Sequence, residues 1–312
     1  YEITELAAAY FEKNLRLTAG REAMAYLARR GFDENIIKKF RLGYAPDNNG
    51  LKAWLASKNV SESDMIELGL AVLSEKNGKL YDFFRDRVII PIMDKRGRVI
   101  AFGGRVMGDG QPKYLNSPDT PVFNKRRVLY NLNYARDKAF EKRRIVVCEG
   151  YMDVIAQAKY GFDYAVAPLG TALTEEQIAE AWKICPEPTL CFDGDNAGIH
   201  AAIRSIDRAL PILKAGYSLK YVFLPDGMDP DEFLKAKGAD EYEKALENTV
   251  PLADLLWRKN VEAVVANTPE QKALFEKTLL EEVAKIADEK VRGYYLQDMK
   301  NRIYERFRRP AR

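Results

Sequence analysis

Residues 191–198 read CFDGDNAG, and this short stretch decides how the middle of the chain folds. The apolar run PTLCF that leads into it is typical of a buried strand, and two aspartates, Asp193 and Asp195, follow at once. Gly194 between them lets the backbone turn, so that both carboxylates can point the same way. Because two like charges this close repel each other, we expect a positive partner beside them.

The segments around this stretch alternate between strand and helix patterns. IVVCEG (145–150), YAVAPLG (164–170), TLCFDGD (189–195) and LKYVFLPDG (219–227) read as strands, and the segments between them read as helices. In one of these helices Thr174 is the expected N-cap, and Gln177 completes a capping box. Short apolar strands that alternate with helices predict a parallel sheet covered on both faces.

The two ends of the chain have a different character. Residues 1–128 begin with helical patterns and continue into RVIIPIMDKRGRVIAFGG (87–104), a predicted hairpin, and then into an irregular, proline-containing segment at 111–130. After about Asp240 the pattern is wholly helical, with three amphipathic helices. We therefore expect an α/β protein with three parts: a basic α+β subdomain (1–128), a parallel-sheet domain (129–240) and a C-terminal helical bundle (241–312).

The composition fits more than one hydrophobic core. The chain has 312 residues, of which 47% are hydrophobic and 30% charged, as is usual for globular proteins. No apolar run approaches the roughly 18 residues of a membrane span. One histidine and three cysteines without a C-x-x-C pair argue against a zinc site. The cysteines, Cys148, Cys185 and Cys191, are interpreted as reduced core thiols of a cytoplasmic protein, and the Tyr1 start suggests a fragment or a processed chain.

Charge is unevenly distributed along the chain. Residues 85–144 hold 15 Lys and Arg against 6 Asp and Glu, whereas residues 145–240 hold 8 against 15. A basic block followed by an acidic one suits a site where a polyanion binds beside metal cations. Two differently solvated surfaces would give the same pattern, and charge alone leaves this choice open.

Three predicted strands end in carboxylates, and the carboxyl ends of parallel strands form the ligand-binding edge of an open sheet. These residues are Glu149, then Asp193 and Asp195, then Asp226, Asp229 and Asp231. Hard divalent cations such as Mg²⁺ take oxygen ligands and relieve the repulsion among them. Since Mg²⁺ usually shares its coordination sphere with substrate phosphates, the pattern indicates phosphoryl transfer.

Local alternatives exist for some of these acids. Asp153 lies four residues after Glu149 and could reach the same place, or it could be an ordinary acid in the first turn of a helix. Asp193 and Asp195 could instead form a turn that caps a helix beginning near Ala197. The order of the three acidic clusters along the chain favours the metal site.

This order, Glu-Gly after one strand and Asp-x-Asp after a later one, resembles the toprim domain of DnaG-type bacterial primases, topoisomerases and some nucleases. The neighbouring segments resemble bacterial DNA primase in particular. They are RVIIPIMDKRGRVIAFGGR (87–105), PKYLNSPDTPVFNKRRVLYNL (112–132), EGYMDVIA (149–156) and FLPDGMDPDEFL (223–234). The resemblance runs from about Tyr26 to Leu234, and the central domain is then a toprim domain.

The resemblance implies a DNA-dependent RNA polymerase that makes short RNA primers from ribonucleoside triphosphates on single-stranded DNA during replication. It makes Glu149 an acid/base candidate or metal ligand, with Asp153 beside it. It makes Asp193, Asp195, Asp229 and Asp231 ligands of two or more Mg²⁺ or Mn²⁺ ions, with no organic cofactor. Basic family positions that line the template and nucleotide groove match Arg30, Arg105, Lys113 and Lys125, and Asn116 and Ser117 lie where they could bond ribose or phosphate.

Full-length bacterial primases also have a zinc-binding domain and a helicase-binding domain, and nothing in this chain matches either. We therefore expect an isolated, monomeric polymerase core, with the replicative helicase bound by a C-terminal domain that is absent here. Topoisomerases share the acid pattern, but the flanking segments do not resemble them. OLD-type nucleases need a G-x-x-x-x-G-K-[ST] motif, which does not occur. A non-enzymatic module that binds single-stranded DNA and holds a structural metal is the remaining alternative.

Overall fold

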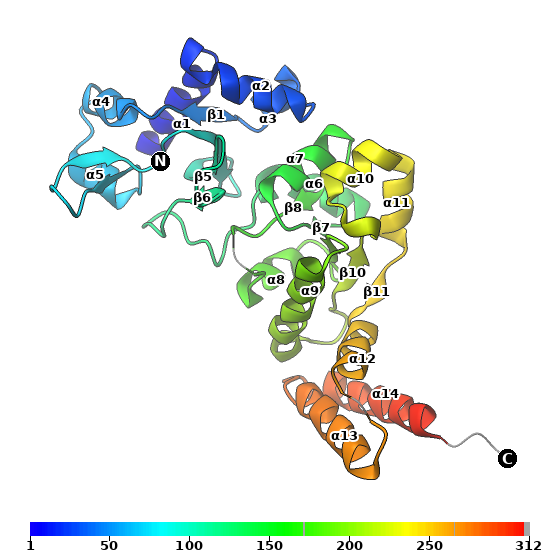
Figure 1. The fold of residues 1–312 in the computed structure, drawn as a ribbon. Coiled ribbons are helices and arrows are strands. Elements are labelled where there is room, and N and C mark those ends of the chain that lie inside the picture. Colours follow the sequence, from blue (N-terminus) through cyan, green and yellow to red (C-terminus); the bar gives the residue numbers. More distant parts are fainter. Residues whose placement is uncertain (171, 265, 309–312) are drawn as a thin grey trace. The chain divides into compact units, whose positions relative to one another are not determined.

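The structure is a computed structural model that describes residues 1–170, 172–264 and 266–308. The chain forms two units. Unit 1 contains Tyr1–Lys138 and Glu149–Thr171, and unit 2 contains Ala139–Cys148 and Ala172–Arg312. Figure 1 follows the chain through both units in sequence colours. The boundaries expected after residues 128 and 240 stay predictions.

Unit 1 is built on a four-stranded antiparallel sheet with the strand order β1-β4-β5-β6. Its strands are β1 (Gly43–Ala45), β4 (Arg87–Met93), β5 (Val99–Val106) and β6 (Tyr114–Asn116). Strands β4 and β5 are the predicted hairpin, which is confirmed. The segment 111–130 was expected to be irregular throughout, and this is wrong for β6, whose three residues pair with β5.

Helix α1 (Glu2–Leu15) packs against β1 and β5 and covers the core of unit 1. The ring of Phe11 meets Phe102 edge to face at 5.3 Å between centroids. The remaining elements of unit 1 are η1 (Thr18–Gly20), α2 (Arg21–Arg29), α3 (Glu34–Lys39), α4 (Gly50–Ala56), α5 (Glu62–Glu67), β2 (Ala71–Leu73), β3 (Leu80–Asp82), α7 (Tyr151–Lys159) and β8 (Ala165–Val166). Helix α6 (Leu132–Lys142) continues from unit 1 into unit 2.

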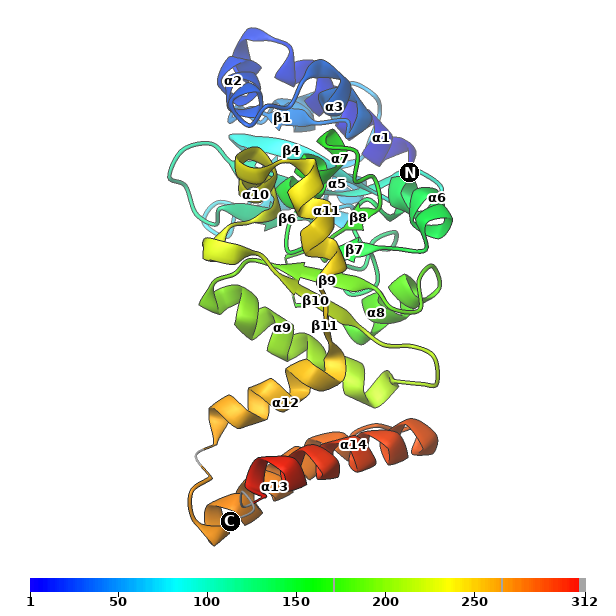
Figure 2. The same cartoon turned by 90° about the vertical axis from the view of Figure 1, so that its right-hand side faces the viewer.

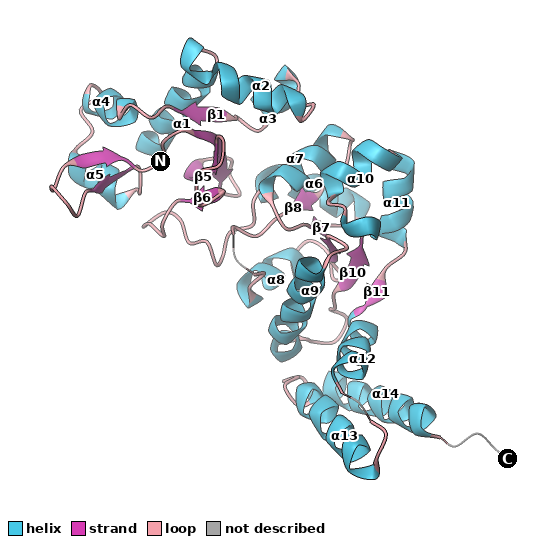
Figure 3. Ribbon diagram, viewed as in Figure 1, coloured by secondary structure: helices cyan, strands magenta, loops and turns pink. Residues whose placement is uncertain are grey.

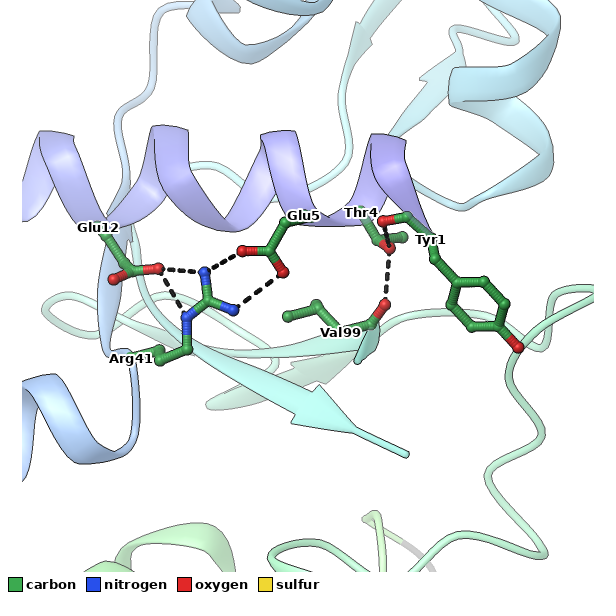
Figure 4. Close-up of polar contacts among 6 residues, drawn as sticks. All are labelled: Tyr1, Thr4, Glu5, Glu12, Arg41 and Val99. Carbon is green, nitrogen blue, oxygen red and sulfur yellow. Dashed lines mark hydrogen bonds and ion pairs between the residues drawn. The ribbon is translucent and has the colours of Figure 1, made fainter. Parts of the chain in front are cut away.

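Two sets of polar contacts hold α1 in place (Figure 4). The hydroxyl of Thr4 donates a 2.7 Å hydrogen bond to the carbonyl of Val99 in β5. Arg41, just after α3, donates to Glu5 at 2.5 Å and to Glu12 at 2.7 Å, two acids on one face of α1. The bond to Glu5 raises the Arg41 pKa, with the bond to Glu12 adding to this effect and burial opposing it. The Arg41 guanidinium therefore connects the turn after α3 to helix α1.

Unit 2 contains the parallel sheet expected from the alternating pattern, and Figure 3 shows its strands among helices. Strands β7 (Val146–Val147), β9 (Thr189–Phe192) and β10 (Lys220–Phe223) are parallel neighbours. Helix α9 (Asn196–Ala209) packs against one face of β9 and β10. Helices α10 (Pro230–Lys237) and α11 (Ala239–Glu247) lie on the opposite side of these strands from α9 in Figures 1 and 2. Unit 2 also contains α8 (Glu175–Trp182), η2 (Leu210–Ile212) and, after β10, η3 (Pro225–Gly227).

The C-terminal part of unit 2 contains the three predicted helices. They are α12 (Leu252–Ala263), α13 (Pro269–Val283) and α14 (Glu289–Phe307). The buried ring of Phe275 meets Trp257 and Phe307 edge to face and joins the three helices. The expectation of a wholly helical chain after Asp240 is wrong at β11 (Val250–Pro251), which pairs antiparallel with β10.

Two further expectations from the sequence are confirmed. The three cysteines are all buried. Thr174 caps α8 and forms the predicted capping box with Gln177. Among the residues that the structure describes, no helix has both the length and the apolar character needed to cross a membrane.

Replacing Arg41 by Met should lower the free energy of unfolding by about 1 kcal/mol, because it leaves two carboxylates of α1 side by side without their cation. Urea denaturation measures the change. The control is Lys38→Met, which removes an exposed cation that lies 3.9 Å from Glu34 and should change stability very little. Equal losses in the two variants would show that Arg41 is an ordinary surface cation.

Candidate functional site

The loops that follow β9 and β10 are in direct contact. A Cβ atom on Gly194 would lie only 1.8 Å from the carbonyl oxygen of Leu224 and 3.3 Å from the nitrogen of Gly227, so no other residue fits at this position. Gly227 has a φ of +69°, and a Cβ added there would lie 3.8 Å from the Cβ of Asp195, at ordinary van der Waals distance. The glycine between the two aspartates therefore does more than turn the chain, since it allows the two acid-bearing loops to touch.

Two of these aspartates also cap helices. Asp195 is the N-cap of α9, and its Oδ1 accepts a 2.8 Å hydrogen bond from the nitrogen of Gly198. Asp229 is the N-cap of α10 and accepts from the nitrogen of Glu232 at 2.8 Å. The capping alternative for Asp195 is thus confirmed, with the helix beginning at Asn196. Each cap occupies one carboxylate oxygen, which leaves the other oxygen of Asp195 and of Asp229 for a ligand.

The other acids of unit 2 differ in exposure. Asp193 is half-buried directly after β9, and Asp226 is exposed with a left-handed φ of 58°. Asp231 is 2% exposed, and its Oδ2 accepts a 2.8 Å bond from the ammonium of Lys235. A cation that approached Asp231 would therefore compete with this lysine.

The donor set suits Mg²⁺ or Mn²⁺, since every candidate ligand is a hard carboxylate oxygen. Within residues 1–170, 172–264 and 266–308, no three His, Cys, Asp or Glu side chains are placed to hold a metal ion together. Mg²⁺ retains several waters and often binds through one or two carboxylates plus substrate phosphates. The loops after β9 and β10 fit that mode of binding.

In unit 1, the start of α7 carries the other two acidic candidates. Glu149 and Asp153 are both half-buried. The Oδ2 of Asp153 accepts a 3.0 Å hydrogen bond from the nitrogen of Gly150, the N-cap of α7. The interpretation of Asp153 as an acid in the first turn of a helix is therefore confirmed, and its carboxylate fixes the turn that follows Glu149.

Tyr151 anchors this turn to the antiparallel sheet of unit 1. It is 4% exposed, and its hydroxyl donates a 2.5 Å hydrogen bond to Oδ1 of Asn116 at the end of β6. Its ring lies so close to Gly103 in β5 that a Cβ there would be 2.9 Å away. Asn116 also donates to the carbonyl of Leu169 at 3.1 Å. The acidic turn is thus tied to β5, β6 and the segment after β8.

Arg30 and Arg105, two of the predicted basic residues, share one aromatic partner. The guanidinium carbon of Arg105 lies 4.2 Å from the centroid of the Tyr26 ring, and that of Arg30 lies 5.7 Å from it. Burial raises the pKa of nearby Tyr114 to about 12, and Tyr26 adds to the rise while Arg30 and Arg105 oppose it. Tyr114 therefore stays a neutral phenol at physiological pH, beside two cations.

Arg87 supports the segment that presents Lys113. It is 6% exposed, and its Nη1 donates to the carbonyls of Gly104 and Pro112 at 3.1 and 2.9 Å. Lys113 itself is exposed. Sequence reasoning missed Arg87 and Tyr26, although a lone arginine at the start of the apolar run RVIIPIM was a usable signal for a buried structural cation.

The remaining candidates have different surroundings. Ser117 is 1% exposed, and its hydroxyl accepts a 3.0 Å bond from the nitrogen of Phe102. Asn116 uses both ends of its amide within the protein, as described above. Lys125 is half-buried, and its backbone nitrogen donates to Asp119 at 2.9 Å. Direct ligand contact by Asn116 and Ser117 stays a prediction, and their observed bonds are structural.

Comparison with known proteins agrees with this arrangement. Residues 10–136 match the family model of the DNA primase catalytic core, N-terminal domain, and residues 146–234 match a toprim-like model. A crystal structure of a DNA primase domain from Pseudomonas aeruginosa is 40% identical, with a TM-score of 0.88 over 98% of this chain and 95% of that one. This chain belongs to the DnaG primase catalytic core family. The toprim-like α/β region expected from the sequence is confirmed.

Two further relatives of the primase core extend the comparison. The DNA primase of Escherichia coli K12 is 38% identical over 97% of this chain, which corresponds to 52% of that protein. A structure described as the DnaG primase catalytic domain bound to ssDNA is 37% identical, with a TM-score of 0.85 over 96% of this chain and 97% of that one. The chain thus spans about half the length of the curated primases that it matches.

Replacing Gly194 by Ala should disrupt the contact between the two acidic loops, because the added Cβ cannot fit against Leu224. We expect a lower melting temperature and loss of any metal-dependent activity, measured by thermal unfolding and by a nucleotide-incorporation assay. The matched control is Gly293→Ala in α14, where a Cβ meets no atom within 4 Å and should be neutral or stabilising. A fully active and stable Gly194→Ala protein would contradict the described contact.

Proposed function

We propose that this primase core synthesises short RNA primers from ribonucleoside triphosphates on single-stranded DNA during replication. The contact between the Asp193–Asp195 loop and the Leu224–Gly227 loop carries the proposal, because it places two acidic clusters beside each other at the carboxyl ends of parallel strands. Similarity to a catalytic domain solved with single-stranded DNA supports the choice of template.

We infer that Asp193, Asp195, Asp229 and Asp231 hold the divalent cations, Mg²⁺ or Mn²⁺, and that two or more ions take part. Bound cations would neutralise triphosphate charge and favour the deprotonated primer 3′-hydroxyl. Asp195 and Asp229 contribute the oxygens outside their helix caps. Because Asp231 pairs with Lys235, its contribution requires that this ammonium turn away or remain as a second cation at the phosphates.

The residues of unit 1 take complementary roles in this proposal. Glu149 serves as acid/base or further metal ligand, and Asp153 and Tyr151 hold its turn in place. Arg30, Arg105, Lys113 and Lys125 bind phosphates of template or nucleotide. The Tyr26 ring limits the freedom of Arg105, so less side-chain entropy is lost when this guanidinium binds a phosphate.

The finer organisation is also a proposal. We infer the three-part layout with divisions near residues 128 and 240, a monomeric and cytoplasmic protein, and no organic cofactor. The replicative helicase is a further partner in this proposal.

Glu149→Gln and Asp193→Asn should each abolish RNA synthesis while leaving the melting temperature close to that of the wild type. Both replacements keep the shape of the side chain and remove the charge that cations or protons need. The measurement is incorporation of labelled ribonucleotides on single-stranded DNA with Mn²⁺ or Mg²⁺, without and with a pre-annealed primer. Asp240→Asn, at an exposed position in the first turn of α11, is the control. Full activity in the Glu149 and Asp193 variants would refute the metal-site assignment.

Arg105→Ala and Lys113→Ala should weaken binding of single-stranded DNA most strongly at low salt, because each variant lacks one cation that neutralises a phosphate. The slope of log affinity against log salt should become shallower by about 0.7 for each phosphate that is no longer neutralised. Fluorescence anisotropy across a salt series measures this slope. Lys277→Ala, which removes an exposed cation of α13, should leave the slope unchanged. Unchanged slopes in the Arg105→Ala and Lys113→Ala variants would show that neither residue neutralises a DNA phosphate.

A further inference from the structure

A pocket of about 330 Å³ opens beside the β4–β5 turn of unit 1. Its floor is aliphatic and made of residues that are at most 6% exposed: Met93, Ile100, Leu129 and Leu132. Val122 and Val128, both half-buried, extend this apolar surface. We call this the β4–β5 pocket. Its volume is near the lower end of the range for ligand pockets, which suits one or two bulky side chains.

The rim of the β4–β5 pocket is basic. Lys95, Arg96, Arg98 and Arg127 line it together with a single acid, Asp94. The Asp94 carboxylate is engaged within the turn, where it accepts from the backbone nitrogens of Arg96 and Arg98 and from the Arg98 guanidinium at 2.7 Å. In the described part of the chain, Arg96 and Arg127 have no acidic partner. The rim therefore presents a net positive charge above an apolar floor.

The rim is also held in place before any ligand arrives. The guanidinium of Arg98 is fixed by Asp94 and lies 3.7 Å from the centroid of the Tyr1 ring. Burial acts to raise the Asp94 pKa, but hydrogen bonds from the backbone and side chain of Arg98 outweigh it and hold that pKa below its ordinary value. A turn stabilised in this way loses little entropy when it binds a partner.

The lining argues against a nucleic-acid ligand. No aromatic residue lines the β4–β5 pocket, and single-stranded nucleic acids are usually held by base stacking on aromatic rings. A phosphate alone would use the rim and leave the floor exposed to water. A peptide with an apolar side chain between acidic residues matches both the floor and the rim.

We propose that the β4–β5 pocket docks a segment of a partner protein in which one bulky apolar side chain is flanked by acidic residues. The apolar side chain fills the space above Ile100 and Leu129, and the flanking carboxylates pair with Arg96 and Arg127. None of these residues has a role in the proposed RNA synthesis, so this inference is independent of the proposed function.

The test uses a fluorescein-labelled peptide that carries one Phe with Asp residues on both sides, and follows its anisotropy with the whole chain. The wild type should bind it, and two control peptides, with Ser for Phe or with Asn for every Asp, should bind much more weakly. The double variant Arg96→Glu/Arg127→Glu should bind about tenfold more weakly, since two favourable charge pairs become repulsive. Val122→Trp should also weaken binding by filling the space without changing charge.

The control for charge is Lys13→Glu/Lys76→Glu, the same change at two exposed lysines away from the β4–β5 pocket, which should bind as the wild type does. Circular dichroism and incorporation of ribonucleotides should be unchanged in all variants, which separates a damaged docking site from a damaged fold. The proposal is overturned if the peptide binds the Arg96→Glu/Arg127→Glu variant as well as it binds the wild type. It is equally overturned if the peptide fails to bind the wild type, or if oligo-dT displaces it and loses affinity in that variant.

Discussion

The close approach of Gly194 to the carbonyl of Leu224 is the contact on which the acidic edge of the parallel sheet depends. Any side chain at this position would push the loop after β9 away from the loop after β10. Both loops begin where parallel strands end, so their separation would move apart the two groups of carboxylates at this edge of the sheet. Helix caps at Asp195 and Asp229 then fix each loop to the helix that follows it. The same aspartates therefore use one oxygen to cap a helix and leave the other available to a ligand.

Unit 1 positions its functional groups by a different means, with buried polar anchors on an antiparallel sheet. Tyr151 ties the turn after Glu149 to Asn116, and Arg87 ties the segments that precede Arg105 and Lys113 to each other. These anchors are well satisfied and mostly buried, which makes them costly to remove. Arg105 and Lys113 therefore extend from a backbone that these anchors hold in place.

Much of this arrangement could be predicted from the sequence, because apolar runs and periodicity report local structure. The hairpin at 87–104, the parallel strands and the three C-terminal helices all follow from such patterns. The strand β11 could not be predicted, since it has only two residues, one of them a proline, which carry no periodic signal and pair only because β10 offers an edge. The same limit applies to the candidate site. The spacing of acids after predicted strands identified the candidate carboxylates. It could not show that Ser117 is buried, that Arg87 holds two backbone carbonyls or that Asp231 pairs with Lys235, because these features arise from tertiary contacts.

The central claim is that the carboxylates after β9 and β10 hold a divalent cation. Its most direct test is a Mn²⁺ titration of the protein alone, in which electron paramagnetic resonance measures the free ion. The account predicts that the wild type removes Mn²⁺ from solution, that Asp193→Asn and Asp195→Asn remove much less at the same protein concentration, and that Asp240→Asn behaves as the wild type. Equal Mn²⁺ binding by all four proteins would contradict it, because the ion would then be held by other residues.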